Sequence, residues 1–317
     1  AIERPLVFAD NDRPGVMLAN AYRAYTNQYG IIPEKEIVIF TNNDDAYRTA
    51  IDLHAIGVKI PAIIDIRTNP DGDLPTIATK LGINILENTA ITNVVGTQSI
   101  KAIDVMTLNE NGDGLIGVVN RIKCNGIASS GGWNPAIHLH SQSGGKATYN
   151  KERGIYIPDS KTSKILCVGA IMGDFNLSKC FKNGVKVGKI AASKAGFKKI
   201  IQTRVPNTND IEETPHRILW VIPTNLSMGQ RGKHFLDLQN DVTVTDIQLA
   251  AREGYTSIEH TKRYTTLGMA TDQGKTGNIL GMATLAQSIN ARDPGEVGTT
   301  TFRPPYTPVT IGAFAGR

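Results

Sequence analysis

The turn Thr41–Ala46, with the sequence T-N-N-D-D-A, lies between an apolar strand and a helix, where dinucleotide-binding proteins carry glycines. Glycines are needed there because backbone N–H groups must approach a pyrophosphate closely, and this turn has none. Asp44 and Asp45 would place negative charge at the helix N-terminus and repel a phosphate. Asp65 stands about where the ribose-binding acid of such folds would be. We therefore predict that residues 37–66 form a βαβ unit without a ligand, with a dinucleotide site as the alternative.

A second turn, Gly169–Asp174 (G-A-I-M-G-D), follows the apolar residues 165–168 and precedes a helix predicted from about Asn176. Its two glycines and the helix N-terminus would offer free N–H groups to an anion, and Asp174 could take a hydroxyl. An ordinary strand-to-helix turn has the same features. The residues alone leave both interpretations open.

A third turn, Ser129–Pro135 (S-S-G-G-W-N-P), has two glycines after a strand, which permit close backbone approach to another group. A tight turn packed beneath Trp133 is the alternative. His138 and His140 would lie on one face of a strand, as two metal ligands might, but no third ligand is nearby. We predict no metal site. No Ser-His-Asp or Cys-His set can be nominated, so we predict no catalytic residue either.

The stretch Thr271–Thr276 (T-D-Q-G-K-T) looks like an ATP-binding loop, but its spacing is wrong. A Walker motif has four residues between its glycines, whereas five separate Gly268 from Gly274. No apolar strand precedes it either. Its last three residues, with Lys275 among them, still precede a helix predicted from Gly277, which favours a phosphate cradle of another kind.

The composition is that of an ordinary globular protein, with 317 residues, 40% hydrophobic and 20% charged residues, and a formal charge of +5. The lysines between Lys179 and Lys199 recur along a predicted helix, so they fit a solvated helix face better than a nucleic-acid surface, which would need aromatic residues interleaved with the basic ones. Cys124, Cys167 and Cys180 share no short spacing, which indicates a reducing cytoplasm, with Cys167 buried in a strand. No apolar run reaches the roughly 18 residues of a membrane span. We expect neither nucleic acid nor membrane as a partner.

The apolar periodicity and the turn residues predict the remaining elements. Strands are expected at 6–8, 37–40, 58–66, 83–86, 124–132 and 165–168, with an antiparallel excursion around the turn 109–114. Helices are expected at 15–29, 46–56, 74–80 and from 176, and, after a linker at 206–210, from capping boxes at Thr243–Asp246 and Thr256–Glu259 and over 277–289.

Several long motifs together resemble the alpha subunit of heterotetrameric sarcosine oxidase. The resemblance covers essentially the whole chain and is carried by the motifs E-R-P-L-V-F-A-D-N-D-R-P-G-V-M-L, V-I-F-T-N-N-D-D-A-Y-R-T-A, S-S-G-G-W-N-P-A-I-H-L-H-S-Q-S-G-G-K, Q-N-D-V-T-V-T-D-I and V-G-T-T-T-F-R-P-P-Y-T-P-V. The family protein also has an N-terminal glycine-rich motif and a C-terminal folate-binding domain, which are absent here. The chain therefore looks like an internal segment.

The resemblance implies an α/β fold of the two-dinucleotide-binding-domain flavoprotein reductase type, in part, followed by a small helical domain. The implied segments are the tail of the first lobe at 1–33, a degenerate second lobe at 34–115, a return to the first lobe at 116–205, the helical module at 206–298 and a linker at 299–317. In such folds the glycine turn completes the first lobe's site. The resemblance therefore implies that NAD is bound by Gly169, Ala170, Ile171, Gly173, Asp174, Phe175, Asn176 and Leu177.

The helical module resembles the bacterioferritin-associated-ferredoxin-like domain, which holds a two-iron, two-sulfur cluster on four cysteines. Asp237, Gln239, Asp272 and Gly277 stand where those cysteines would be. A cluster needs thiolates, so we predict none here. The implied replacement role is contact with flavin mononucleotide (FMN) at the interface with the beta subunit, through Thr265, Thr266, Gln273, Gly274, Lys275 and Thr276, with Lys275 at the phosphate.

The family reaction demethylates sarcosine oxidatively to glycine, with hydrogen peroxide and 5,10-methylenetetrahydrofolate as further products. It uses flavin adenine dinucleotide (FAD) in the beta subunit, and the partners of the alpha subunit are the beta, gamma and delta subunits. The role implied for this segment is binding and assembly. Two alternatives stay open: a component of a related flavin-dependent amine, opine or proline dehydrogenase, and a non-enzymatic scaffold. Related alpha chains usually keep the cluster cysteines, which argues against the former.

Overall fold

A five-stranded parallel sheet forms the centre of the computed structural model, which describes residues 1–159, 165–197, 204–209, 211, 213–226, 232–300, 302, 304 and 307–315. Its strands, in spatial order, are β2 (Val16–Leu18), β9 (Gly126–Ser130), β3 (Ile37–Thr41), β4 (Ile63–Asp65) and β5 (Ile85–Leu86). Every neighbouring pair is parallel. All five residues of β3 are buried, as is typical of a strand covered on both faces.

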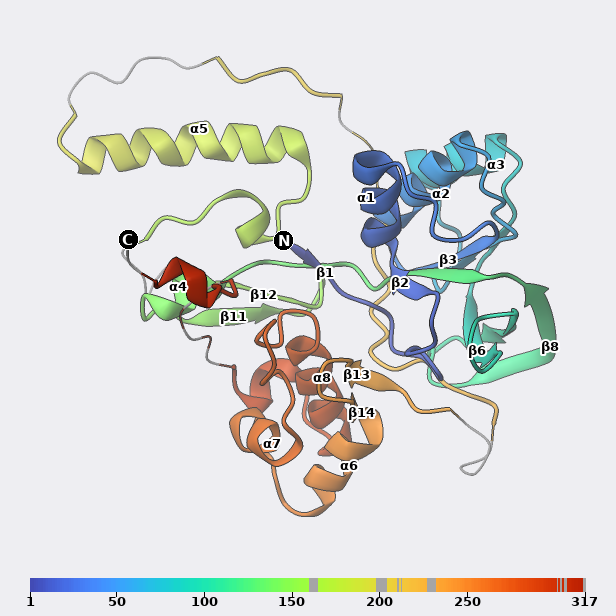
Figure 1. Cartoon of the computed structure of the whole chain (residues 1–317). Helices are drawn as coiled ribbons and strands as arrows, with labels where there is room; N and C mark the ends of the chain where they lie inside the picture. The colour runs from blue at the N-terminus through green and yellow to red at the C-terminus, as the bar shows by residue number, and fades with distance from the viewer. Residues whose placement is uncertain are drawn as a thin grey trace.

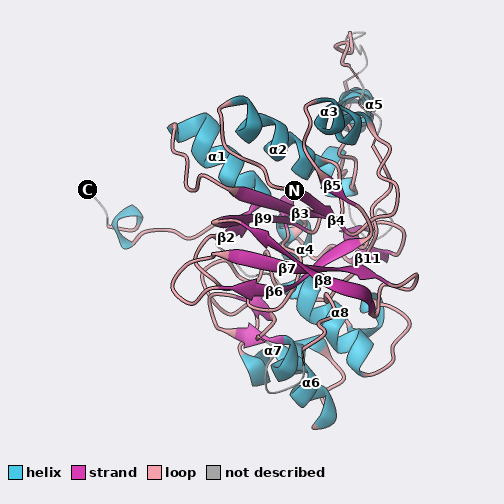
Figure 2. Ribbon diagram, turned by 90° about the vertical axis from the view of Figure 1, so that its right-hand side faces the viewer, coloured by secondary structure: helices cyan, strands magenta, loops and turns pink. Residues whose placement is uncertain are grey.

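Helices cover one face of this sheet and a second sheet covers the other (Figure 2). The helices are α1 (Ala19–Tyr29), α2 (Asp45–Ala55) and α3 (Asp73–Lys80), and they pack on Ile37, Ile39 and Ile63. The second sheet is antiparallel, with β6 (Thr89–Val95), β7 (Ala102–Leu108) and β8 (Leu115–Lys123). It packs on the alternate residues Val38, Phe40 and Ile64. The structure therefore confirms the predicted βαβ unit and the antiparallel excursion.

The prediction was wrong at the N-terminus. Residues 6–8 are buried but form no strand, because Leu6 N bonds the Ser129 side chain and Val7 O accepts from Ile222. The strand there is β1 (Ile2–Glu3), which pairs with β10 (Trp133–Asn134). The predicted helix 15–29 begins only at Ala19, since the preceding residues pair with β9 as β2.

The segment after β10 also differs from the prediction. It forms α4 (His138–Gln142), the hairpin β11 (Ala147–Asn150) and β12 (Ile155–Pro158), the short 3-10 helix η1 (Gly169–Met172) and α5 (Leu177–Lys194). No strand exists at 165–168 because no neighbouring strand in the described part of the chain pairs with it, and Ile165 and Leu166 are exposed. Cys167 is consequently half-buried and not a buried strand thiol. Helix α5 lies apart from both sheets (Figure 1), and only Ser178 in it is buried.

The helical module contains the hairpin β13 (Phe235–Asp237) and β14 (Val242–Thr243), then α6 (Val244–Arg252), α7 (Ile258–Thr265), α8 (Asn278–Ser288) and η2 (Pro294–Val297); η3 (Ile311–Ala313) follows. The capping box at Thr243–Asp246 is confirmed by reciprocal hydrogen bonds. The box predicted at Thr256–Glu259 is wrong, because Ser257 is the N-cap and its side chain makes no cap bond. Within the ranges given above, no helix is long and apolar enough to cross a membrane.

Candidate functional sites

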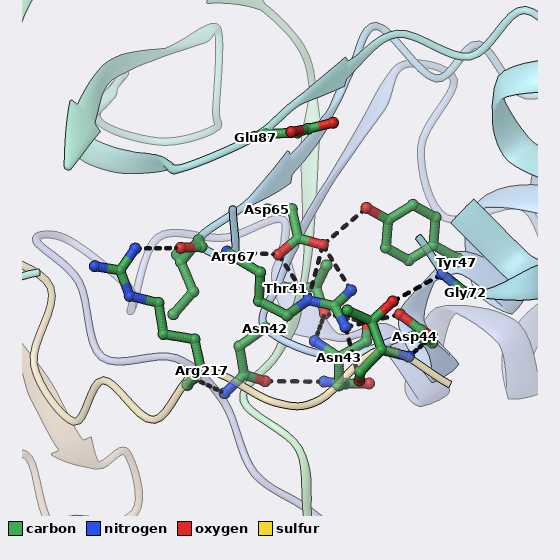
Figure 3. Close-up of polar contacts among 12 residues, drawn as sticks. Thr41, Asn42, Asn43, Asp44, Tyr47, Asp65, Arg67, Gly72, Glu87 and Arg217 are labelled. Carbon is green, nitrogen blue, oxygen red and sulfur yellow. Dashed lines mark hydrogen bonds and ion pairs between the residues drawn. The ribbon is translucent and has the colours of Figure 1, made fainter. Parts of the chain in front are cut away.

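Polar side chains from the turn Thr41–Ala46 and from the end of β4 form a hydrogen-bonded network (Figure 3). Arg67 lies between two carboxylates, with its Nη1 atom 2.7 Å from Asp44 Oδ1 and its Nη2 atom 2.7 Å from Asp65 Oδ2. All three side chains are at most 3% exposed. The Tyr47 hydroxyl also donates to Asp65, at 2.8 Å. Burial raises the pKa of Asp44, and Arg67 partly opposes that rise.

A strap, Glu213–Arg217, crosses the carboxyl end of β3 and β4 at this turn. The backbone N–H of Thr214 donates to Asp44 Oδ2 at 2.7 Å, and its Oγ1 accepts from Gly72 N at 2.8 Å. Arg217 donates to Ile66 O at 2.8 Å, and its own carbonyl accepts from the Asn42 side chain. The carboxyl ends of parallel strands are the usual ligand position of such sheets. Here residues 213–217 of the chain lie at that position.

The glycines of the turn Ser129–Pro135 approach the chain's own backbone. A Cβ atom on Gly131 would lie 2.6 Å from Pro5 O, and Arg4 Nε donates to Gly131 O at 2.7 Å. The tight-turn interpretation explains this geometry without a ligand.

His138 and His140 lie on helix α4 and not on a strand, which corrects the expected arrangement. His140 Nε2 is 2.9 Å from Lys146 O, and its Nδ1 is 3.8 Å from the Cys167 sulfur. Among the described residues, no three His, Cys, Asp or Glu side chains lie together as metal ligands would.

The second turn borders a cavity of about 310 Å³. Four of the predicted NAD residues line it, namely Gly173, Asp174, Phe175 and Asn176, and the strap with its His216 forms the opposite wall. The remaining four do not line it: Gly169, Ala170, Ile171 and Leu177.

Interactions within the chain hold this second turn. Arg153 Nη1 donates to Gly173 O, Asn183 donates to Asp174 Oδ2 at 2.9 Å, and the Asn176 side chain caps α5. Burial and the surrounding arginines lower the pKa of His216 to about 4, so this ring is neutral at pH 7.

The four positions that would hold cluster cysteines converge in the helical module. Asp237 accepts from Gly268 N at 2.7 Å and from Gln239 N at 2.9 Å. The Gln239 side chain accepts from Asp272 N at 3.4 Å. A Cβ on Gly277 would lie 3.5 Å from Asp237 Cβ. Hydrogen bonds between protein groups therefore connect the positions that correspond to the cluster cysteines.

The predicted FMN residues are divided among different surroundings. Gly274 and Lys275 line a cavity of about 330 Å³, whereas Thr276 lines another of about 210 Å³ beside β2. The backbone of Gln273 has a left-handed conformation, and its carbonyl oxygen accepts a hydrogen bond from the Asn278 side chain. Thr265 Oγ1 bonds Thr261 O within α7, and Thr266 is the left-handed residue that ends α7, so neither lies at these cavities.

Comparison with known proteins identifies the relatives of this chain. It is 38% identical to the "Sarcosine oxidase subunit alpha" of Corynebacterium sp. (strain P-1) over 322 residues, covering 100% of the chain and 33% of the relative. The same subunit of Rhizobium meliloti (strain 1021) is 38% identical over 318 residues, again covering the whole chain and 30% of the relative. This chain is a homologue of sarcosine oxidase alpha subunits. It spans about a third of the length of the curated relatives it matches.

A family model and a solved structure also match. Residues 231–317 match the family described as "Sarcosine oxidase A3 domain". The fold resembles that of L-proline dehydrogenase from P. horikoshii, with a TM-score of 0.68 and 18% identity, over 100% of this chain and 57% of that one. At that identity the likeness shows the fold alone.

Sequence reasoning missed the residues that act through long-range contacts. Arg67 and Thr214 are 147 positions apart, and neither belongs to a recognisable motif. Lys146 lines a cavity of about 330 Å³ but lies in a motif that the sequence analysis interpreted through its glycines and histidines. The sequence signal available for Lys146 was its place, directly after the glycine pair Gly144–Gly145.

Proposed function

We propose that this chain is the segment of a sarcosine oxidase alpha subunit that binds NAD and contacts FMN. The whole protein would demethylate sarcosine to glycine, with hydrogen peroxide and 5,10-methylenetetrahydrofolate as products. The single observation that carries the proposal is the similarity to sarcosine oxidase alpha subunits along the entire chain. The beta, gamma and delta subunits are the proposed partners, FAD is assigned to the beta subunit, and the expected cytoplasmic location stays a prediction.

The turn at Gly169–Leu177 supports the NAD assignment. Gly169 and Gly173 both have positive φ angles, so the backbone turns sharply before α5, as close approach to a dinucleotide requires. Asp174 is held by Asn183 beside a cavity whose volume suits part of a nucleotide. The Asp174 carboxylate would accept a ribose hydroxyl of NAD there, whereas the N–H groups of Gly173 and Asp174 bond Ala170 O and Gly169 O within the turn. When bound, NAD would be a passive ligand, with no proton or hydride removed by a residue of this chain.

The position of Lys275 and Gly274 at one cavity supports the FMN assignment. Lys275 and Gly274 line a mostly apolar cavity, as expected of a site that takes a planar ring with a charged end. Bound FMN supplies one-electron and two-electron chemistry, and this chain's residues would bind and orient it.

The helical module supports a role without an iron-sulfur cluster. Asp237, Gln239, Asp272 and Gly277 supply no thiolate, and hydrogen bonds satisfy the three polar side chains. The ferredoxin-like ancestry of the module is part of the same proposal.

A related flavin-dependent dehydrogenase component is the second candidate, because the fold is like that of L-proline dehydrogenase. One experiment separates the candidates. The chain, extended to the full length of its relatives, is co-expressed with a sarcosine oxidase beta subunit, and NAD and flavins are assayed after denaturation. We expect a complex with NAD, FMN and FAD that reduces oxygen with sarcosine. A complex active on proline or an opine instead supports the second candidate, and an uncomplexed, nucleotide-free chain contradicts the first.

A further inference from the structure

A thiol and an imidazole from different elements lie side by side next to the second turn. Cys167 precedes the first residue of that turn, Gly169, by two positions, and His140 lies on α4. The Cys167 sulfur is 3.8 Å from His140 Nδ1, within hydrogen-bonding reach for the larger sulfur atom. The proposed function uses neither side chain, so the pair has no role there.

The backbone determines which nitrogen of His140 carries the proton. Nε2 is 2.9 Å from Lys146 O, and a carbonyl oxygen can only accept, so the neutral ring carries its proton on Nε2. Nδ1 then has a lone pair that accepts from the Cys167 thiol. His140 is 2% exposed, and a Cβ on Gly145 would overlap its ring. The packing around the ring therefore directs a basic nitrogen at the sulfur.

The three cysteines of the chain differ in what their sulfur atoms contact. Cys124 is 1% exposed, and burial raises its pKa to about 12. Cys167 and Cys180 are both half-buried, and burial raises the pKa of each thiol. Cys180 donates to Asp174 O at 3.0 Å, whereas Cys167 contacts an imidazole nitrogen. All three thiols therefore keep their protons at neutral pH, and the contacts described for Cys167 include a group that can remove one.

We propose that Cys167 is a peroxide-reactive thiol of this chain and that His140 is its general base. The thiol proton passes to His140 Nδ1 as the sulfur attacks one oxygen of hydrogen peroxide. A sulfur–oxygen bond forms and the oxygen–oxygen bond breaks. The proton on Nδ1 then joins the departing hydroxide to give water. The sulfur is oxidised by two electrons to a sulfenic acid, and the peroxide is reduced by the same two electrons.

A metal site would be the other use of a cysteine beside a histidine. Such a site takes at least three protein ligands, and among the described residues no group of three His, Cys, Asp or Glu side chains is placed to hold a metal ion. The thiol can be reached, because Cys167 is half-buried and the preceding Leu166 is 40% exposed. Hydrogen peroxide would be a product of the proposed reaction, but the inference does not depend on that reaction, since peroxide can be added.

The test treats the full chain with hydrogen peroxide, traps sulfenic acid with dimedone and follows the labelling of each cysteine by mass spectrometry. We expect Cys167 to be labelled about 10-fold faster than Cys180, because general-base catalysis is typically worth at least that much. Cys180 is a matched control in the same molecule, since its thiol is also half-buried and its pKa is also raised. Equal labelling of the two thiols, or none at Cys167, overturns the inference.

A variant of His140 separates the base from the loop that its ring contacts. His140→Gln keeps an N–H donor for Lys146 O but supplies no base, so labelling of Cys167 should slow about 10-fold while labelling of Cys180 is unchanged. At a pH high enough to ionise the thiol directly, the variant and the unaltered chain should be labelled equally fast. Equal rates at neutral pH, or a difference that persists at high pH, would show that His140 is not the base. Circular dichroism checks that the variant is folded.

Discussion

The two turns of this chain that resemble nucleotide-binding turns differ in burial and in packing. The turn at Thr41–Ala46 keeps its βαβ architecture, but Asn42, Asn43 and Asp44 are buried, and Arg67 and the strap bond Asp44. The turn at Gly169–Asp174 keeps its glycines and opens onto a cavity, but its helix α5 barely packs on the body. The difference teaches that acidic residues at a helix N-terminus become part of a core once a buried cation pairs them. The glycine turn is held by hydrogen bonds from Arg153 and Asn183 and still borders a cavity.

The largest expected effect is from removing the cation at the first turn. In Arg67→Ala, Asp44 and Asp65 lose their shared partner while buried, which should lower the free energy of unfolding by about 3–5 kcal/mol. Urea denaturation measures the loss. Arg121→Ala, which removes an exposed partner of Asp104, is the control and should change stability far less. A similarly small loss for Arg67→Ala would mean that the buried network does not hold the turn.

A pH effect comes next, through Glu3, which accepts from Asn20 N at 2.8 Å beside the first turn. Burial raises its pKa from 4.5 to about 7. Between these two pKa values the unfolded chain releases the Glu3 proton while the folded chain keeps it. The contribution of Glu3 to the free energy of unfolding is therefore fully present below pH 4.5 and is lost as the pH rises through 7. Relative to Glu3→Gln, the native chain should lose up to about 3 kcal/mol across this window. Parallel stability–pH curves for the two proteins would disprove the assignment.

The smallest effect concerns the second turn. Asn176 caps α5, and Asn176→Ala should destabilise that helix by about 1 kcal/mol. Because α5 packs so little, the loss should appear as roughly five-fold faster amide exchange at its N-terminus, without a change in the global unfolding midpoint. The matched cap Thr243→Ala, on the packed helix α6, should instead lower global stability by about 1 kcal/mol. Equal global losses would remove the distinction between the two regions.

Local sequence signals predicted much of the α/β fold. The apolar run at 37–40, the polar turn after it and the helical pattern that follows led directly to the βαβ unit. The strands at 6–8 and 165–168 were predicted wrongly because apolar runs do not say whether a pairing strand is present.

The candidate sites were less predictable, because their key contacts join distant residues. Asp44 was interpreted as a charge that repels phosphate, and its partners Arg67 and Thr214 are visible only in the folded chain. Lys275 was identified from its loop, whereas Lys146 lines the same cavity from a turn whose carbonyl oxygen contacts His140.

The strap has a further consequence for cleavage of the chain. The hairpin β11–β12 and the strap each pack on the folded body, and α5 lies on the excursion between them. A protease that nicked the exposed residues around Gly196 would therefore leave two fragments still associated. Such a split chain should behave as a complementing pair, reassembled through the Thr214 and Arg217 contacts.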